Sequence, residues 1–297
     1  MYTFHTGKEL LQLTKKNKIP ISETVLRYEV SNSTRTRKQV IDKMFQRLDY
    51  MDNAIKDGLK NRKQSASGMS GLDTAKLKKA LKNKKFLLNS VTLKAMLYAL
   101  STVENNATMG CIVANPTAGS SGVIPGVLFA VKESLRLSKA KLLNGLFVSS
   151  GIGIIIAENA TLAGAEGGCQ AEIGSATAMA AAAITEMRGG TPEDCLNAAS
   201  LALKNLLGLT CDPIGGLVEV PCIKRNALAA VYSIAASDLT IAGVKSFVPF
   251  DEIVDAMSNI GKLISPKLRE TALGGLAVTD TGKKLNKKLG LKIKDMS

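Results

Sequence analysis

The segment Gly164–Gly190, GAEGGCQAEIGSATAMAAAAITEMRGG, predicts the fold class more clearly than any other stretch of the chain. From Gln170 to Met187 it contains seven alanines, and alanine has the highest intrinsic helix propensity. Gly189 and Gly190 then end the predicted helix. Because alanine side chains are small, the segment predicts a strong helix with close neighbours.

Outside this segment, apolar residues recur three and four positions apart, whereas alternating strand patterns are rare and short. This spacing predicts an all-α fold. We expect a single, predominantly helical domain over residues 1–297, with glycine-rich loops around a buried cluster site and a more polar helical group at residues 1–60. The length and the 45% hydrophobic content suffice for one sizeable core. Expected helices are Lys8–Lys16, Ser22–Val30, Arg35–Leu59, Phe86–Thr108, Gln170–Met187 and Ile223–Ser237.

One helix start and one loop are also visible in the sequence. Thr191 resembles a capping residue, with Pro192 at the first helical position and Asp194 three residues after the cap. This helix is expected to end near Gly208. Two prolines and two glycines between positions 213 and 221 predict a loop from Cys211 to Cys222.

Positive charge is the main compositional bias, with a formal net charge of +14. Lysines gather in Lys76–Lys85 and in Lys283–Lys294. The first group alternates with Leu77 and Leu81 at helical spacing, which favours a solvated helix face. An acidic protein partner or a nucleic acid remains an alternative, although aromatic residues amount to only 4% and tryptophan is absent. We expect no nucleic-acid partner.

The most apolar window, Gly145–Ala157, is shorter than the roughly 20 residues that span a bilayer, and it predicts a buried core segment. Residues Met1–Pro20 do not resemble a secretory signal. The expected location is therefore the cytoplasm, without a membrane partner.

Three cysteines lie in glycine- and proline-rich settings: Cys169 follows Gly167 and Gly168, and Cys211 and Cys222 end the segment CDPIGGLVEVPC. Glycine lets the backbone approach an inorganic ligand closely. Cys169 also opens the alanine-rich helix, where the helix dipole favours a thiolate. Three thiolates without a fourth can hold an iron-sulfur cluster and leave one iron open for chemistry.

The remaining candidates for metal ligands are weaker. Structural zinc sites usually have four ligands, often in close C-x-x-C pairs, and no such pair occurs. Cys195 shares a helix face with alanines and is predicted to lie in the core. Cys111, four residues before Asn115, stays an open alternative. The single histidine, His5, lies in the polar N-terminal region and is predicted to be solvated.

A second polar feature is the segment PTAGSSG, Pro116–Gly122, which precedes an expected helix. Hydroxyls and free backbone amides at a helix start suit a carboxylate or a phosphate, although such residues also act as simple caps. The similar cluster Ser67–Gly71 forms either a second polar edge of a binding site or simply a turn.

Four segments together resemble one family, the alpha chain of the iron-sulfur-dependent L-serine dehydratases, also called L-serine ammonia-lyases. The resemblance covers almost the whole chain, and the segments occur in the family order. They are ANPTAGSSGVIPG (Ala114–Gly126), GAEGGCQAEIGSA (Gly164–Ala176), TCDPIGGLVEVPCIKRN (Thr210–Asn226) and ETALGGLAVTDTGK (Glu270–Lys283).

The resemblance implies that Cys169, Cys211 and Cys222 hold a [4Fe-4S] cluster. It implies the conversion of L-serine to pyruvate and ammonia, in which the open iron acts as a Lewis acid on the substrate hydroxyl while a base removes the α proton. The sequence does not identify that base.

The PTAGSSG segment matches the substrate-side loop of the family, which makes Thr117, Ser120 and Ser121 candidate contacts for the serine carboxylate or amine. The family also contains a serine-serine-histidine-threonine motif, either fused or on a separate beta chain. This motif is absent here, so the resemblance implies an L-serine dehydratase beta subunit as a partner.

One departure from the family occurs at SASGMSGLD, Ser65–Asp73, where Leu72 replaces a glycine and serines replace threonines. Leu72 therefore puts the backbone geometry of this loop in question. Three other functions stay open at this point: a pyridoxal-dependent dehydratase, a different open-cluster hydro-lyase acting on a hydroxy acid, and a basic nucleic-acid-binding protein without enzymatic activity.

Overall fold

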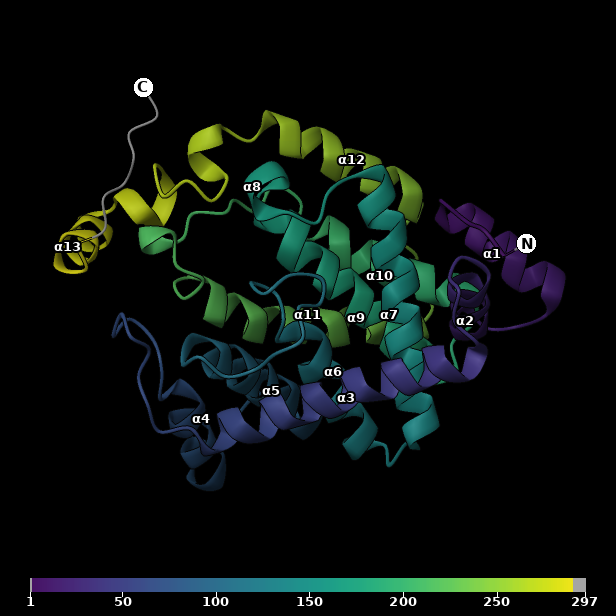
Figure 1. The fold of residues 1–297 in the computed structure, drawn as a ribbon, viewed down its shortest axis with the longest axis horizontal. Helices are drawn as coiled ribbons and strands as arrows, with labels where there is room; N and C mark the ends of the chain where they lie inside the picture. Colours follow the sequence, from purple (N-terminus) through teal and green to yellow (C-terminus); the bar gives the residue numbers. More distant parts are fainter. Residues whose placement is uncertain (1, 291–297) are drawn as a thin grey trace.

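The computed structural model describes residues 2–290, which contain thirteen α-helices and no β-strand (Figure 1). The predicted all-α fold is confirmed. The helices are α1 (Gly7–Asn17), α2 (Ile21–Ser31), α3 (Arg37–Lys60), α4 (Asp73–Asn83), α5 (Ser90–Ala107), α6 (Val123–Ser134), α7 (Lys139–Asn159), α8 (Gly164–Gly167), α9 (Ser175–Met187), α10 (Pro192–Lys204), α11 (Cys222–Ile241), α12 (Phe250–Leu263) and α13 (Asp280–Lys288).

Side-chain caps start several of the helices, among them α1, α3, α5, α7, α10 and α13. Thr191 and Asp194 form the predicted capping box at the start of α10. The predicted helix at Phe86 was wrong by four residues, because the Asn89 side chain accepts a hydrogen bond from the Thr92 N–H and starts α5 at Ser90. α10 ends at Lys204, before the expected Gly208.

The alanine-rich helix α9 lies at the centre of the bundle, surrounded by α6, α7, α10 and α11 (Figure 1). All of its residues are buried. Close helix packing also occurs elsewhere: a Cβ atom on Gly58 of α3 would lie 1.9 Å from the Ser101 carbonyl oxygen of α5. Small side chains therefore set the distances between helices at several crossings.

α7 has the length and apolar composition of a membrane-spanning helix, but 67% of its most apolar 18-residue window is buried within the protein. It packs against α9 and α2. The predicted core segment Gly145–Ala157 is confirmed as part of this helix.

The lysines of α4 occupy the exposed side of an amphipathic helix, whereas Leu77 and Leu81 are half-buried. The predicted solvated face is confirmed at Lys76–Lys85. α13 lies at the far end of the molecule from α1 (Figure 1). Lys292 and Lys294 of the second lysine group, and the ends of the predicted 1–297 domain, lie outside the described residues.

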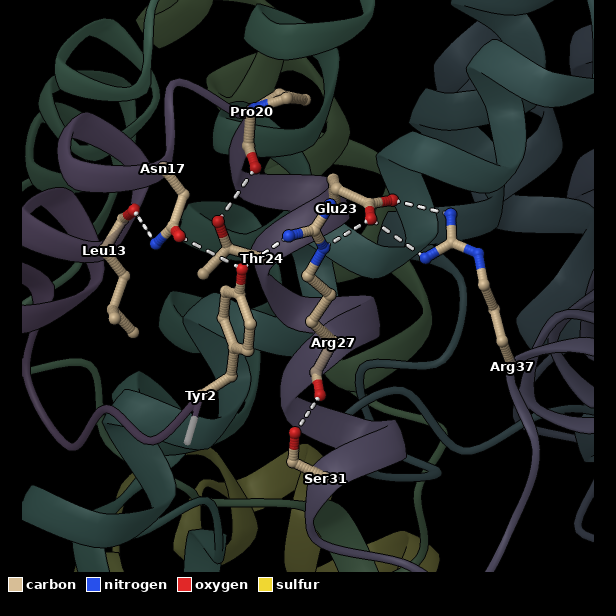
Figure 2. A network of polar contacts seen from close by, with 9 residues as sticks. All are labelled: Tyr2, Leu13, Asn17, Pro20, Glu23, Thr24, Arg27, Ser31 and Arg37. Carbon is tan, nitrogen blue, oxygen red and sulfur yellow. Dashed lines mark hydrogen bonds and ion pairs between the residues drawn. The ribbon is translucent and has the colours of Figure 1, made fainter.

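The N-terminal helices share the main core, since Leu10 of α1, Val25 of α2 and Met51 of α3 belong to the same buried cluster as α9. Figure 2 shows Glu23 on α2 between two arginines. Its carboxylate lies 2.7 Å from Arg27 Nε and 2.7 Å from Arg37 Nη2. The hydrogen bond from Arg37, followed by that from Arg27, lowers the pKa of Glu23 although burial opposes the shift.

Replacing Glu23 with Gln is expected to lower the free energy of unfolding by about 0.5–1 kcal/mol near neutral pH, because the two arginines are partly solvated. A carboxyl group whose pKa is lowered by folding stabilises the protein above its unfolded pKa, and this contribution disappears as pH falls through the folded value. The difference between the two proteins should therefore vanish in acid, as measured by urea unfolding from neutral pH down to about pH 3. A pH-independent difference would contradict the ion-pair account. Glu29→Gln, which removes a more exposed pair with Arg35, is the control.

Candidate functional site

The three cysteines singled out in the sequence lie where segments meet around the core helices. Cys169 stands between α8 and a π-helical turn, Gln170–Gly174, that leads into α9. Cys211 lies in the loop after α10, and Cys222 is the first residue of α11. All three are buried, with exposed fractions of 2%, 2% and 6%.

Backbone hydrogen bonds hold the first two cysteines in place. Gln170 N–H donates to the Leu209 carbonyl at 3.0 Å, which joins the turn after Cys169 to the loop before Cys211. Cys211 in turn donates its N–H to Leu268 at 2.8 Å and accepts from Glu270 N–H at 2.7 Å. The segment after α12 therefore fixes the backbone at Cys211.

The thiols of Cys169 and Cys211 lie close enough for a hydrogen bond between them to shift both pKa values. This bond, together with the charge of Arg225, lowers the pKa of Cys169 against the effect of burial. The same bond and burial raise the pKa of Cys211. Of the two thiols, Cys169 is therefore the more readily ionised. Burial raises the pKa of Cys222 to about 12, and the Cys169 charge contributes.

No group of three His, Cys, Asp or Glu side chains within residues 2–290 could hold a single metal ion. An iron-sulfur cluster is a larger body, and its thiolate ligands surround it instead of meeting at one atom. The donor set here consists of three buried thiols on separate segments. Its chemistry fits such a cluster better than it fits a single ion.

An ion pair supports the backbone beside the thiols. Arg225 Nη2 lies 3.0 Å from Asp212 Oδ1, and Arg225 Nη1 donates to the Thr210 carbonyl at 2.8 Å. Asp212 also accepts the Leu276 N–H at 2.9 Å. At the neighbouring Gly275, with φ +58°, a Cβ would lie 2.4 Å from Asp212 Oδ2. Glycine is therefore required at this contact.

The loop Pro116–Gly122 lies beside the cysteines through Glu172. Thr117 Oγ1 donates to Glu172 Oε1 at 2.6 Å, and the hydroxyls of Thr117 and Ser120 lie 3.1 Å apart. Ser120 and Ser121 are fully buried. Ser121 donates its hydroxyl to the Ala118 carbonyl at 2.8 Å and so closes the loop.

Glu172 is held between this loop and the cysteines. A Cβ on Gly119 would lie 3.1 Å from Glu172 Oε1, and a Cβ on Gly164 would lie 2.8 Å from Oε2 and 3.2 Å from Cys211 Sγ. Burial raises the pKa of Glu172, and the nearby Glu270 adds to the rise, whereas the Thr117 hydroxyl opposes it.

Asn226 on α11 connects the loop Pro116–Gly122, called the hydroxyl loop below, to Cys222. Its Oδ1 accepts the Gly122 N–H at 2.9 Å, and its Nδ2 donates to the Gly119 carbonyl at 2.7 Å and to the Cys222 carbonyl at 2.9 Å. The side chain is fully buried. One amide therefore fixes the position of the loop relative to the start of α11.

The serine cluster before α4 also reaches the cysteine loop. Ser67 Oγ donates to Glu219 Oε1 at 2.9 Å, and Ser70 donates to the second carboxylate oxygen. Both hydroxyls thus bind a carboxylate of the Cys211–Cys222 segment. Leu72 adopts the left-handed conformation, with φ +69°, which costs a residue with a Cβ energy that glycine avoids. The departure from the family falls at a position whose backbone favours glycine.

The other sulfur and imidazole candidates lie in different surroundings. Cys195 is fully buried in α10, and burial raises its pKa. The prediction of a core residue is confirmed. Cys111 is exposed. The His5 side chain is 61% exposed, and its Nδ1 lies 2.8 Å from Glu158 Oε2.

Sequence reasoning did not single out four polar residues of this region: Glu172, Glu219, Arg225 and Asn226. Each lies within a segment quoted for its cysteine. The sequence did contain a signal for them, because each is an ionisable or amide side chain inside a glycine-rich, apolar segment. Such a side chain becomes buried when the segment folds, and a buried polar group needs a hydrogen-bond partner.

Three buried thiols next to a hydroxyl-bearing loop, inside an all-α bundle, define a protein with a candidate site for a metal cluster and a small polar ligand. The family model described as "Serine dehydratase alpha chain" matches residues 16–277. The chain belongs to this family.

Individual relatives that carry the name of this family are similar to the chain over most of its length. The chain is 46% identical over 286 residues to the probable L-serine dehydratase alpha chain of Bacillus subtilis, covering 96% of this chain and 95% of that protein. It is 43% identical over 283 residues to the L-serine dehydratase alpha chain of Peptoniphilus asaccharolyticus, covering 95% and 97%. The L-serine dehydratase TdcG of Escherichia coli is 34% identical over 287 residues, which cover 93% of this chain and 62% of TdcG.

Replacing Asn226 with Ala is expected to lower the free energy of unfolding by about 2–3 kcal/mol, because buried amide and carbonyl partners are left unpaired. Urea denaturation measures the change. Ser233→Ala on the same helix removes a buried hydroxyl that donates to Thr177 and Ala229, and it should cost only about 1 kcal/mol. Equal losses in the two variants would contradict the bridging role of Asn226.

Proposed function

We propose that this chain is the alpha chain of an L-serine dehydratase, which converts L-serine to pyruvate and ammonia. The observation that carries the proposal is the meeting of Cys169 and Cys211 beside Glu172 and the Thr117 hydroxyl. The relatives described above are named for the same activity.

In this proposal Cys169, Cys211 and Cys222 are the ligands of a [4Fe-4S] cluster. When bound, such a cluster with one iron free of cysteine supplies a Lewis acid for the substrate hydroxyl. The positive charge of Arg225 compensates thiolate charge at Cys169, and the Asp212 ion pair keeps Arg225 in place. Burial of the thiols keeps competing water away from them.

The hydroxyl loop is the proposed binding site for the substrate. Thr117, Ser120 and Ser121 are assigned to the carboxylate or amine of L-serine. The Ser120 and Ser121 hydroxyls are buried and shape the loop, whereas Thr117 is only partly buried. Direct contact with the substrate carboxylate is therefore assigned first to the backbone amides around Thr117, since the Thr117 hydroxyl donates its proton to Glu172.

A beta chain is the proposed partner. Relatives named as alpha chains are covered almost completely by this chain, whereas 62% of TdcG is covered. We infer that a separate beta chain contributes the part of the active site that the longer relatives carry, and that the complex functions in the cytoplasm. The surplus of positive charge would favour encounter with an acidic partner.

The proposed reaction is tested by pyruvate release from L-serine, using the alpha chain purified and reconstituted with iron and sulfide without oxygen. We expect turnover when the candidate beta chain is added and almost none without it. Normal rates from the alpha chain alone would contradict the divided site. Absence of pyruvate with every beta chain tested would contradict the reaction.

The ligand assignment is tested by single replacements. Cys211→Ser and Cys222→Ser are expected to abolish both bound iron and pyruvate formation, because serine is a poor substitute for a thiolate ligand. Cys195→Ser should retain iron and activity and cost only stability, since Cys195 lies in the core of α10. Iron content and pyruvate release are measured on the same preparations. Equal losses in all three variants would refute the assignment.

A further inference from the structure

Between Gly167 and Met187, Glu172 is the one residue that is only partly buried. Every neighbour in this stretch of the central helix faces the protein interior, yet this carboxylate retains partial exposure at the level of the cysteines. It lies on the π-helical turn, Gln170–Gly174. Such turns interrupt regular helix geometry and occur frequently at functional sites.

The surroundings of Glu172 leave one carboxylate oxygen available. Oε1 accepts the Thr117 hydroxyl at 2.6 Å. For Oε2, no hydrogen bond is formed within the described part of the chain. This oxygen is close to Gly164, which has no side chain to cover it, and on the same side as Cys211 Sγ.

Glu172 has no direct cationic partner within residues 2–290, although the charge of Arg225 acts on the neighbouring Cys169 and Cys222. Within residues 2–290 its own pKa is influenced by a second carboxylate, Glu270, and by no cation. Its charge acts in turn on all three thiols, Cys169, Cys211 and Cys222. A half-buried carboxylate without a cationic partner is costly. Binding of a cation at this position would remove that cost.

We propose that Glu172 binds the α-ammonium group of the substrate and thereby selects an amino acid over the corresponding hydroxy acid. This inference rests on the proposed function. The carboxylate of L-serine has hydrogen-bond donors in the Thr117 loop, its ammonium group has an acceptor in Glu172 Oε2, and its hydroxyl remains free to face the cysteines. The Thr117 hydroxyl has a positioning role, because it fixes the orientation of the Glu172 carboxylate.

A charged acceptor of this kind discriminates strongly between a ligand with an ammonium group and a ligand without one. A buried carboxylate that pairs with a cation disfavours an analogue with a neutral group in its place, because the hydrogen bond is then no longer assisted by charge and the carboxylate loses its counter-charge. L-glycerate is the matched analogue, since it has a hydroxyl in place of the ammonium group and is otherwise identical to L-serine. Removing the negative charge of Glu172 should therefore weaken the binding of L-serine but not the binding of L-glycerate.

The experiment compares wild type, Glu172→Gln and Glu166→Gln, each loaded with iron and sulfide and combined with the beta chain. Glu166 is a matched control: it also accepts a threonine hydroxyl, from Thr161 at 2.5 Å, but it is exposed. The measurements are bound iron, the KM for L-serine, and the dissociation constant of L-glycerate by calorimetry.

For Glu172→Gln we expect unchanged iron, a KM for L-serine raised about 30-fold or more, and L-glycerate affinity that is unchanged or increased. Glu166→Gln should match wild type in all three measurements. Glu172→Asp, which keeps the charge, should retain the preference for L-serine.

Three results would overturn the inference: an unchanged KM for L-serine, an equal loss of affinity for L-serine and L-glycerate, or loss of iron from Glu172→Gln, which would make Glu172 a support of the cluster. Failure of the proposed function is a separate result, because wild type would then form no pyruvate.

Discussion

The close packing of helices around α9 is the constraint on which the candidate site depends. Alanine side chains allow α7, α10 and α11 to approach this helix closely, and all of its residues are buried. Cys169 precedes α9, Cys211 follows α10 and Cys222 starts α11. The packing of these helices therefore brings the segments that carry the three cysteines to one region of the molecule. Larger side chains on α9 would separate the segments that carry the sulfurs.

A set of buried polar contacts then fixes the loops relative to this core. Asn226 joins the hydroxyl loop to Cys222, Arg225 joins Asp212 to the Thr210 carbonyl, and Glu219 accepts two serine hydroxyls from the segment before α4. Each contact satisfies groups that would otherwise be buried without partners. Each buried polar group stabilises the fold only when all of its partners are in place. The geometry of each loop therefore depends on segments that lie far away in the sequence.

The fold was predictable wherever a signal is local. The capping box at Thr191 and the alanine run of α9 are encoded within a few residues, and both were predicted. The start of α5 was not, because an isolated Asn89 in a polar stretch is a weak signal until its contact with Thr92 is seen. The three cysteines were proposed as ligands from their glycine- and proline-rich settings, and that assignment stays a prediction. Glu172 was not singled out, since its partner Thr117 lies 55 residues earlier. Likewise, Asn226 meets Gly119 across 107 residues, and sequence spacing does not show such contacts.

The central claim is that three thiolates hold a cluster with one iron open to L-serine. Mössbauer spectroscopy of the alpha and beta chains, reconstituted with ⁵⁷Fe and sulfide without oxygen, tests it most directly. The account predicts a four-iron cluster in which a single iron changes its signal when L-serine is added. A chain that binds no iron, or a cluster whose irons all remain unchanged with L-serine, would contradict it.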